Sequence, residues 1–118
     1  MKYDNRVYLE HIAECIRRVE HNMAGGRDAF MSSETLQDAT LRNLQVMAES
    51  TQRLAEPLKA SQPQVDWKGL SGFRNVLAHG YLDIRLERVW RVLEQDLPTL
   101  KGAILELLRN APDEPVQS

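Results

Sequence analysis

The sequence has little cysteine and no long apolar run, and each shortage excludes a class of protein. Its single cysteine, Cys15, cannot form an internal disulfide, which argues against a small disulfide-stapled secreted fold. No apolar run approaches the roughly 20 residues that a helix needs to cross a bilayer, so we expect neither a membrane span nor a membrane partner. A reducing, cytoplasmic setting fits these features best.

The sequence also lacks an excess of charge of either sign. It carries 15 Lys and Arg residues against 17 Asp and Glu residues, for a formal net charge of −2. A protein that coats nucleic acid without specificity would be strongly basic, so this class is disfavoured. A local basic cleft is still compatible with the composition, because the field at a surface depends on how charges are distributed as well as on their total.

What the sequence does contain is apolar residues at helical spacing. They recur every three or four residues over about residues 4–23, 32–60, 67–79 and 86–109, which predicts four amphipathic helices. No segment shows the sustained alternation that is typical of a strand. We therefore predict an all-α fold, an up-and-down four-helix bundle whose helices are long, long, short and long. The bundle should form one domain over residues 1–110, with a flexible C-terminal tail over 111–118.

Several residues predict where these helices begin, bend or end. Ser32 or Ser33 would cap the second helix, and Asp66 would cap the third. Pro57 should interrupt or end the second helix, because proline lacks the N–H that the helix interior needs. Pro98 should kink the last helix one turn before it.

The third predicted helix ends in the run Arg74-Asn75-Val76-Leu77-Ala78-His79-Gly80-Tyr81. Five residues of a helix turn through about 500°, so Arg74 and His79 would lie about 140° apart and would not share a face. Gly80 is typical of a helix stop, and a chain that leaves the helix there can bring His79 back toward the side of Arg74. Asn75 can hydrogen-bond to either side chain and fix it.

These residue types suit the cleavage of RNA, whose 2′-hydroxyl can attack the neighbouring phosphate. The reaction needs a group that moves protons, and the imidazole of His79 titrates near neutral pH when unperturbed. It also needs a cation beside the phosphate, and the guanidinium of Arg74 can bind two phosphate oxygens. This chemistry requires no metal and no cofactor, and it leaves a 2′,3′-cyclic phosphate or a related end. The alternative is that Arg74 and His79 are an ordinary helix-end pair on the bundle surface.

The run from Phe73 to Tyr81 resembles the Arg-x4-His-x-Tyr motif of the HEPN-domain toxins, the ribonuclease half of HEPN/MNT toxin–antitoxin pairs in the HepT-like family. Trp67 near the start of the same helix, the segment Arg42–Glu49 and the order of helix lengths extend the resemblance over nearly the whole chain. The resemblance implies a HEPN-like bundle and the activity of an endoribonuclease toxin from a type VII-like toxin–antitoxin system.

The resemblance also implies partners and further site residues. Toxins of this family form homodimers, which place two motifs across a shared cleft. The tyrosine of the motif, here Tyr81, is where the nucleotidyltransferase antitoxin attaches AMP; the alternative is a tyrosine that caps the bundle. Glu49 matches an acidic position on the family's second helix and would orient Arg74 or His79; the alternative is a plain surface glutamate.

Basic residues flank or follow the motif at Lys68, Arg85, Arg88 and Arg91. In a two-fold dimer they would be doubled, and they could line one basic groove for RNA in a mildly acidic protein. The alternative is that Arg85, Arg88 and Arg91 only solvate the last helix.

Three functions therefore remain open. The first is the toxin, and the second is a non-catalytic HEPN binding or regulatory subunit of a minimal nucleotidyltransferase. The third is a purely structural helical dimer. The presence of Arg74, His79 and Tyr81 favours the enzyme, because a degenerate module should have lost at least one of them. Other catalytic signatures, such as the P-loop, are absent, and His11 and His21 lie too far from His79 in the sequence to predict a zinc site.

Overall fold

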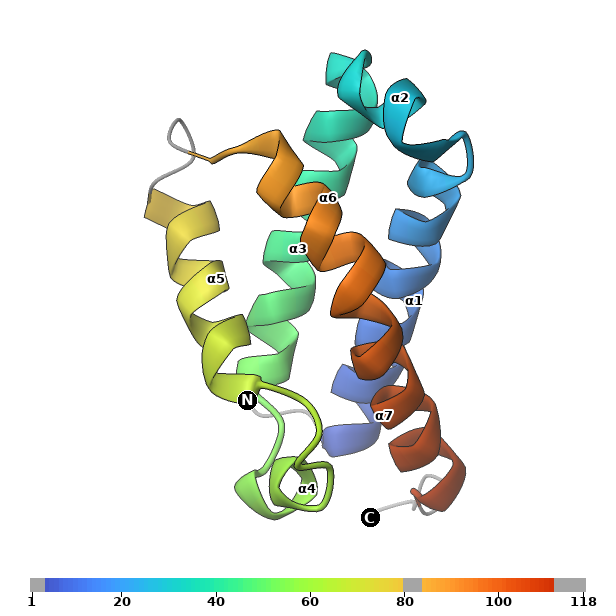
Figure 1. Cartoon of the computed structure of the whole chain (residues 1–118). Helices are drawn as coiled ribbons and strands as arrows, with labels where there is room; N and C mark the ends of the chain where they lie inside the picture. The colour runs from blue at the N-terminus through green and yellow to red at the C-terminus, as the bar shows by residue number, and fades with distance from the viewer. Residues whose placement is uncertain (1–3, 80–83, 112–118) are drawn as a thin grey trace.

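Helices make up the secondary structure of residues 4–79 and 84–111, the parts of the chain that the computed structural model describes. In chain order they are α1 (Asn5–Met23), α2 (Gly26–Met31), α3 (Glu34–Gln52), α4 (Glu56–Ala60), α5 (Trp67–His79), α6 (Leu86–Gln95) and α7 (Leu97–Asn110) (Figure 1). The all-α prediction is confirmed. The predicted tail lies outside the described residues from 112 onward.

The long helices pack as the predicted bundle. α3 packs against both α1 and α5, α7 packs against α1 and α6, and α2 joins the ends of α1 and α3. Figure 1 shows α5, α3 and α1 side by side, with α6 and α7 crossing in front of them. This arrangement makes α3 the neighbour that faces α5 along its length.

The core consists of the apolar stripes that the sequence predicts. Residues at steps of three and four on α1, α3, α6 and α7 turn toward the bundle axis, where burial of apolar surface stabilises the fold. On α1 these buried residues are Leu9, Ile12, Ile16 and Val19, and on α7 they are Leu97, Leu100, Ile104 and Leu107. Phe30 of α2 joins them, with its ring centroid 5.3 Å from that of Trp90 on α6.

The second predicted helix is wrong in its extent, because α3 ends at Gln52 and a separate α4 follows it. Pro57 neither interrupts nor ends a helix, since it lies in the first turn of α4. In the first turn of a helix the backbone N–H groups have no acceptor within the helix. A proline there therefore removes no helical hydrogen bond. The chain between the two helices turns at Arg53, whose N–H donates to the Ser50 carbonyl.

The short helix α2 was not predicted at all. Its six residues are too few to show a periodic apolar stripe, and only Phe30 among them is buried. The chain enters α2 at Gly26, which has a φ of +89°, a conformation that glycine adopts readily. Ser33, not Ser32, then caps α3, because its side chain accepts a hydrogen bond from the Leu36 N–H at 3.1 Å.

The last predicted helix is two helices, which meet at Asp96. Pro98 lies in the first turn of α7, so the expected kink is a change of helix close to it. The backbone of Asp96 still donates to the Val92 carbonyl and accepts from the Leu100 N–H. Few backbone hydrogen bonds are therefore lost at the junction, and both apolar stripes stay buried.

Candidate active site

Two contacts hold the start of α5 in place. They therefore also determine where the site residues lie along this helix. Asp66 caps the helix as predicted, since its Oδ1 accepts from the Gly69 N–H at 2.9 Å. The indole N–H of Trp67 lies 2.9 Å from the Lys59 carbonyl, which anchors the helix to the end of α4. Leu77 is 2% exposed and continues the buried face of α5.

Arg74 contacts both of the residues that the sequence proposed as its supports. Its Nε lies 3.8 Å from Oε2 of Glu49 on α3, and its Nη1 donates to Oδ1 of Asn75 at 3.1 Å. Glu49 thus lies beside Arg74, while no contact between Glu49 and His79 is found among the described residues. The Glu49 contact is an ion pair and is too long to be a hydrogen bond.

The guanidinium of Arg74 is only partly satisfied. Its Nε is buried and has no hydrogen-bond acceptor among the described residues. The side chain as a whole is 31% exposed, and Glu49 and Asn75 contact its guanidinium. A cation held this way can accept an anionic oxygen ligand without a large rearrangement.

His79 is the last residue of α5 and is exposed. Within residues 4–79 and 84–111 it has no hydrogen bond or ion pair, so the structure does not bring it into contact with Arg74. The two side chains remain on different sides of α5, as helical geometry predicts. Tyr81 lies outside the described residues.

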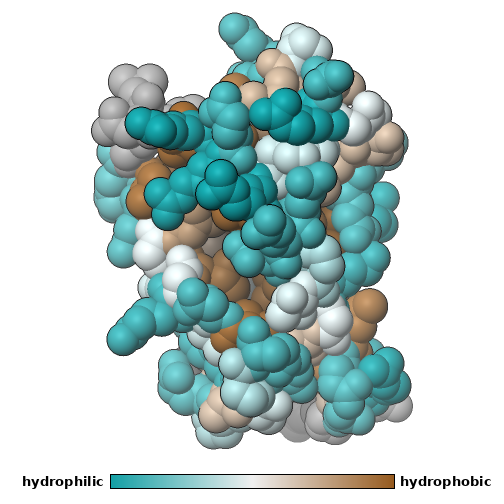
Figure 2. All heavy atoms as spheres, viewed as in Figure 1, coloured by the Kyte–Doolittle hydropathy of each residue, from teal (hydrophilic) through white to brown (hydrophobic). Residues whose placement is uncertain are grey.

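The predicted basic residues are all exposed. Lys68 lies on α5, while Arg85 precedes α6 and Arg88 and Arg91 lie on it. None of the four forms an ion pair with an acid in the described part of the chain. Figure 2 shows strongly hydrophilic side chains over the start of α6. Within residues 4–79 and 84–111, these four cations therefore have no acidic partner that would compete with an external anion.

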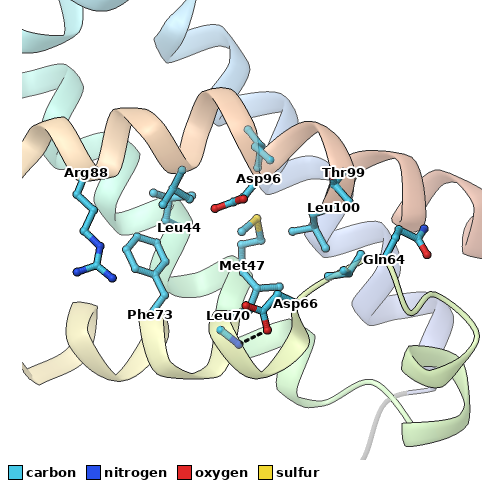
Figure 3. Close-up of a pocket in the computed structure, with 14 residues that line it drawn as sticks. Leu44, Met47, Gln64, Asp66, Leu70, Phe73, Arg88, Asp96, Thr99 and Leu100 are labelled. Carbon is cyan, nitrogen blue, oxygen red and sulfur yellow. Dashed lines mark hydrogen bonds between the residues drawn. The ribbon is translucent and has the colours of Figure 1, made fainter.

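A groove between α5 and the α6–α7 pair was not predicted. It has a volume of about 280 Å³, and Figure 2 shows it as an apolar hollow in the middle of this face. In Figure 3, Arg88 extends from α6 toward Phe73 of α5 at one end, and Asp66 lies at the other. Leu70 and Phe73 of α5 line its wall and are partly exposed.

Other titratable groups lie away from this helix. Hydrogen bonds from Arg17 and Arg18 lower the pKa of Glu14 on α1 to about 2. Burial raises the pKa of the Cys15 thiol, which keeps it in the unreactive protonated form.

Across the described ranges, no three His, Cys, Asp or Glu side chains gather closely enough to hold a metal ion. In the same ranges, no helix is long and apolar enough to cross a membrane.

Known proteins match the chain over the same residues that form this site. A family model described as ribonuclease HepT-like matches residues 10–107, a range that includes Glu49 and the segment from Arg74 to His79. No solved structure matches the chain.

Individual relatives agree with the family match. A protein of Thermococcus cleftensis named as a probable ribonuclease HepT is 28% identical over 108 residues, which cover 91% of this chain and 98% of that protein. A protein of Caldanaerobacter subterraneus subsp. tengcongensis named as a proposed RNase is 28% identical over 105 residues, 88% of this chain and 94% of that one. A third, from Methanocaldococcus jannaschii and named as a gamma-glutamylcyclotransferase and proposed RNase, is 30% identical over 109 residues; these cover 92% of this chain and only 49% of that protein.

Proposed function

The chain belongs to the HepT-like ribonuclease family, and from this premise we propose that it is a metal-independent endoribonuclease whose site is formed by Arg74 and His79. The observation that carries the proposal is the state of Arg74. Its guanidinium contacts Glu49 and Asn75 while its side chain is 31% exposed, and it lies five residues before His79 on the same helix.

The proposed reaction is an internal transfer at an RNA phosphate. The 2′-oxygen attacks phosphorus, the bond from phosphorus to the 5′-oxygen breaks, and a 2′,3′-cyclic phosphate remains. The 2′-hydroxyl gives up a proton and the leaving 5′-oxygen takes one, so the imidazole of His79 acts in proton transfer. Arg74 stabilises the charge that develops on the non-bridging oxygens.

A homodimer would complete this site. A two-fold axis near the end of α5 would bring two copies of Arg74 and His79 to one cleft. One imidazole could then take the proton from the 2′-hydroxyl while the other gives a proton to the leaving oxygen. Lys68, Arg85 and Arg88, exposed and without acidic partners among the described residues, would bind the flanking phosphates.

The proposed biological role is that of the toxin in a type VII-like toxin–antitoxin pair. A nucleotidyltransferase antitoxin would neutralise the chain by attaching AMP to Tyr81. In that step the tyrosine oxygen attacks the α-phosphate of ATP and pyrophosphate leaves. Tyr81 is two residues from His79, so an added anionic group there would repel the phosphates of RNA.

The proposal is tested with the purified protein, an RNA oligonucleotide and three variants. Arg74→Ala and His79→Ala should each lower kcat/KM by at least about 100-fold, because each removes a group used in the transition state. Arg27→Gln, which removes an exposed arginine of α2, is the control and should cleave like the wild type. Equal cleavage by all forms would reject the site. A wild type that cleaves no RNA would favour the non-catalytic binding subunit.

A further inference from the structure

Two contacts fix how α3 and α5 lie against each other. Glu49 of α3 pairs with Arg74 of α5 at 3.8 Å, and Nε2 of Gln52 donates to Oγ of Ser71 at 3.1 Å. A step of three residues forward along α3 therefore matches a step of three residues back along α5. The two helices are antiparallel, and their facing polar residues form a ladder with a defined register.

The same register places Arg42 at the end of α5. Arg42 precedes Glu49 by seven residues, which is two turns of helix, so both lie on the same stripe of α3 with an offset of about 10 Å. In the antiparallel direction, that offset leads from Arg74 to a level just beyond His79, the last residue of α5. Arg42 is thus the α3 residue that the register brings level with the end of the candidate site.

Arg42 is exposed and has no partner among the described residues. This differs from the arginines of α1, since Arg6, Arg17 and Arg18 all pair with glutamates one turn away. Asp38 lies one turn before Arg42, at a spacing that favours an ion pair, and yet no ion pair forms between them. Within the described residues, the guanidinium of Arg42 is therefore not compensated by an acid, at the position where an extended RNA would leave the site.

We infer that Arg42 binds a phosphate of the RNA next to the one held by Arg74, and so makes the site specific for chains with more than one phosphate. The inference rests on the proposed ribonuclease function. A guanidinium binds a phosphate through two parallel N–H donors, and among the described residues Arg42 forms no ion pair that must first be broken. Arg42 acts in binding and not in the chemical step, because it lies beyond His79 relative to Arg74.

The test measures binding and cleavage separately in Arg42→Gln, Arg42→Lys and the control Arg27→Gln. Binding is measured by fluorescence anisotropy with a 2′-O-methyl RNA oligonucleotide, which cannot be cleaved, over a series of salt concentrations. For Arg42→Gln we expect Kd and KM to rise about 10-fold. We also expect the plot of the logarithm of the association constant against log salt to become less steep by about 0.7, the value for one phosphate contact on a single strand. We expect kcat to stay within about two-fold of wild type, and Arg42→Lys to recover the salt slope.

The outcomes separate the two proposals. A wild type that cleaves RNA while Arg42→Gln keeps its Kd, KM and salt slope overturns the role of Arg42 alone. A loss of kcat in Arg42→Gln with unchanged binding also overturns it, because a phosphate-binding residue should affect KM. A wild type that neither binds nor cleaves RNA overturns the proposed function, and the role of Arg42 with it.

Discussion

Glu49 of α3 lies 3.8 Å from Arg74 of α5, measured from Oε2 to Nε, and this ion pair joins two helices at the proposed catalytic arginine. The carboxylate restrains a long, flexible side chain without enclosing it. A bound RNA phosphate would approach the same guanidinium from the solvent side. Arg74 is therefore in contact with a residue 25 positions away in the sequence.

Replacement of this carboxylate should affect the chemical step. In Glu49→Gln we expect kcat to fall about 10-fold without a rise in KM, because Arg74 loses its restraint while its affinity for phosphate is not reduced. The free energy of unfolding should change by less than about 1 kcal/mol, since both side chains of the pair are partly exposed. Glu56→Gln, which removes the exposed partner of Lys59, is the matched control. An unchanged kcat in Glu49→Gln would show that Glu49 does not position Arg74.

Arg74→Lys tests whether the geometry of the guanidinium matters beyond its charge. Lysine keeps the positive charge and cannot present two parallel N–H donors to a phosphate. We expect RNA binding to stay within about three-fold of wild type while kcat falls about 10- to 100-fold. Steady-state kinetics and binding of 2′-O-methyl RNA measure the two effects. Full activity with lysine would mean that any cation at this position is sufficient.

Which face of α5 packs against the bundle can be tested by measuring the stability of the protein. Leu77→Ala should lower the free energy of unfolding by about 2–4 kcal/mol, because this side chain is 2% exposed and its removal leaves a cavity. Val76→Ala, at a residue that is 46% exposed on the same helix, should change it by less than about 0.5 kcal/mol. Urea unfolding measures both. Similar losses in the two variants would contradict the orientation of α5.

The lowered pKa of Glu14 predicts a specific pH dependence. Hydrogen bonds from Arg17 and Arg18 stabilise the charged carboxylate, so its contribution to stability is present above its ordinary pKa of 4.5 and is lost as the pH falls toward about 2. Glu14→Gln removes this group. Its Tm should therefore fall less steeply than that of the wild type between pH 4.5 and pH 2. Parallel curves of Tm against pH over this range would contradict the prediction.

The sequence predicted α5 from residue 67 to residue 79 because local signals suffice there: Asp66 caps the helix and an apolar stripe follows it. The role of Pro57 was predicted wrongly, because a proline inside a periodic stretch can either end one helix or start the next. Which of the two occurs depends on whether the chain turns before the proline. The sequence did not predict α2, because a six-residue helix is too short to show a period.

The candidate site also combines features that local sequence can predict with features that depend on how the helices pack. Arg74, Asn75 and His79 stand in one short run and could be found by their spacing, while Glu49 was proposed from a family resemblance and is now seen beside Arg74. Neither the lack of a described partner for Arg42 nor the groove beside Phe73 could be predicted, because both depend on the register of α3 against α5 and on the packing of α6. No pattern within a single helix contains that information.

The most direct test of the account is the rate at which the purified protein cuts an RNA oligonucleotide, compared with the same oligonucleotide carrying one 2′-deoxy nucleotide at the cut position. The account predicts that the wild type cuts the RNA to a 2′,3′-cyclic phosphate, leaves the deoxy position intact, and loses this activity in His79→Ala. Cleavage of both substrates at equal rates, or equal cleavage by His79→Ala, would contradict it.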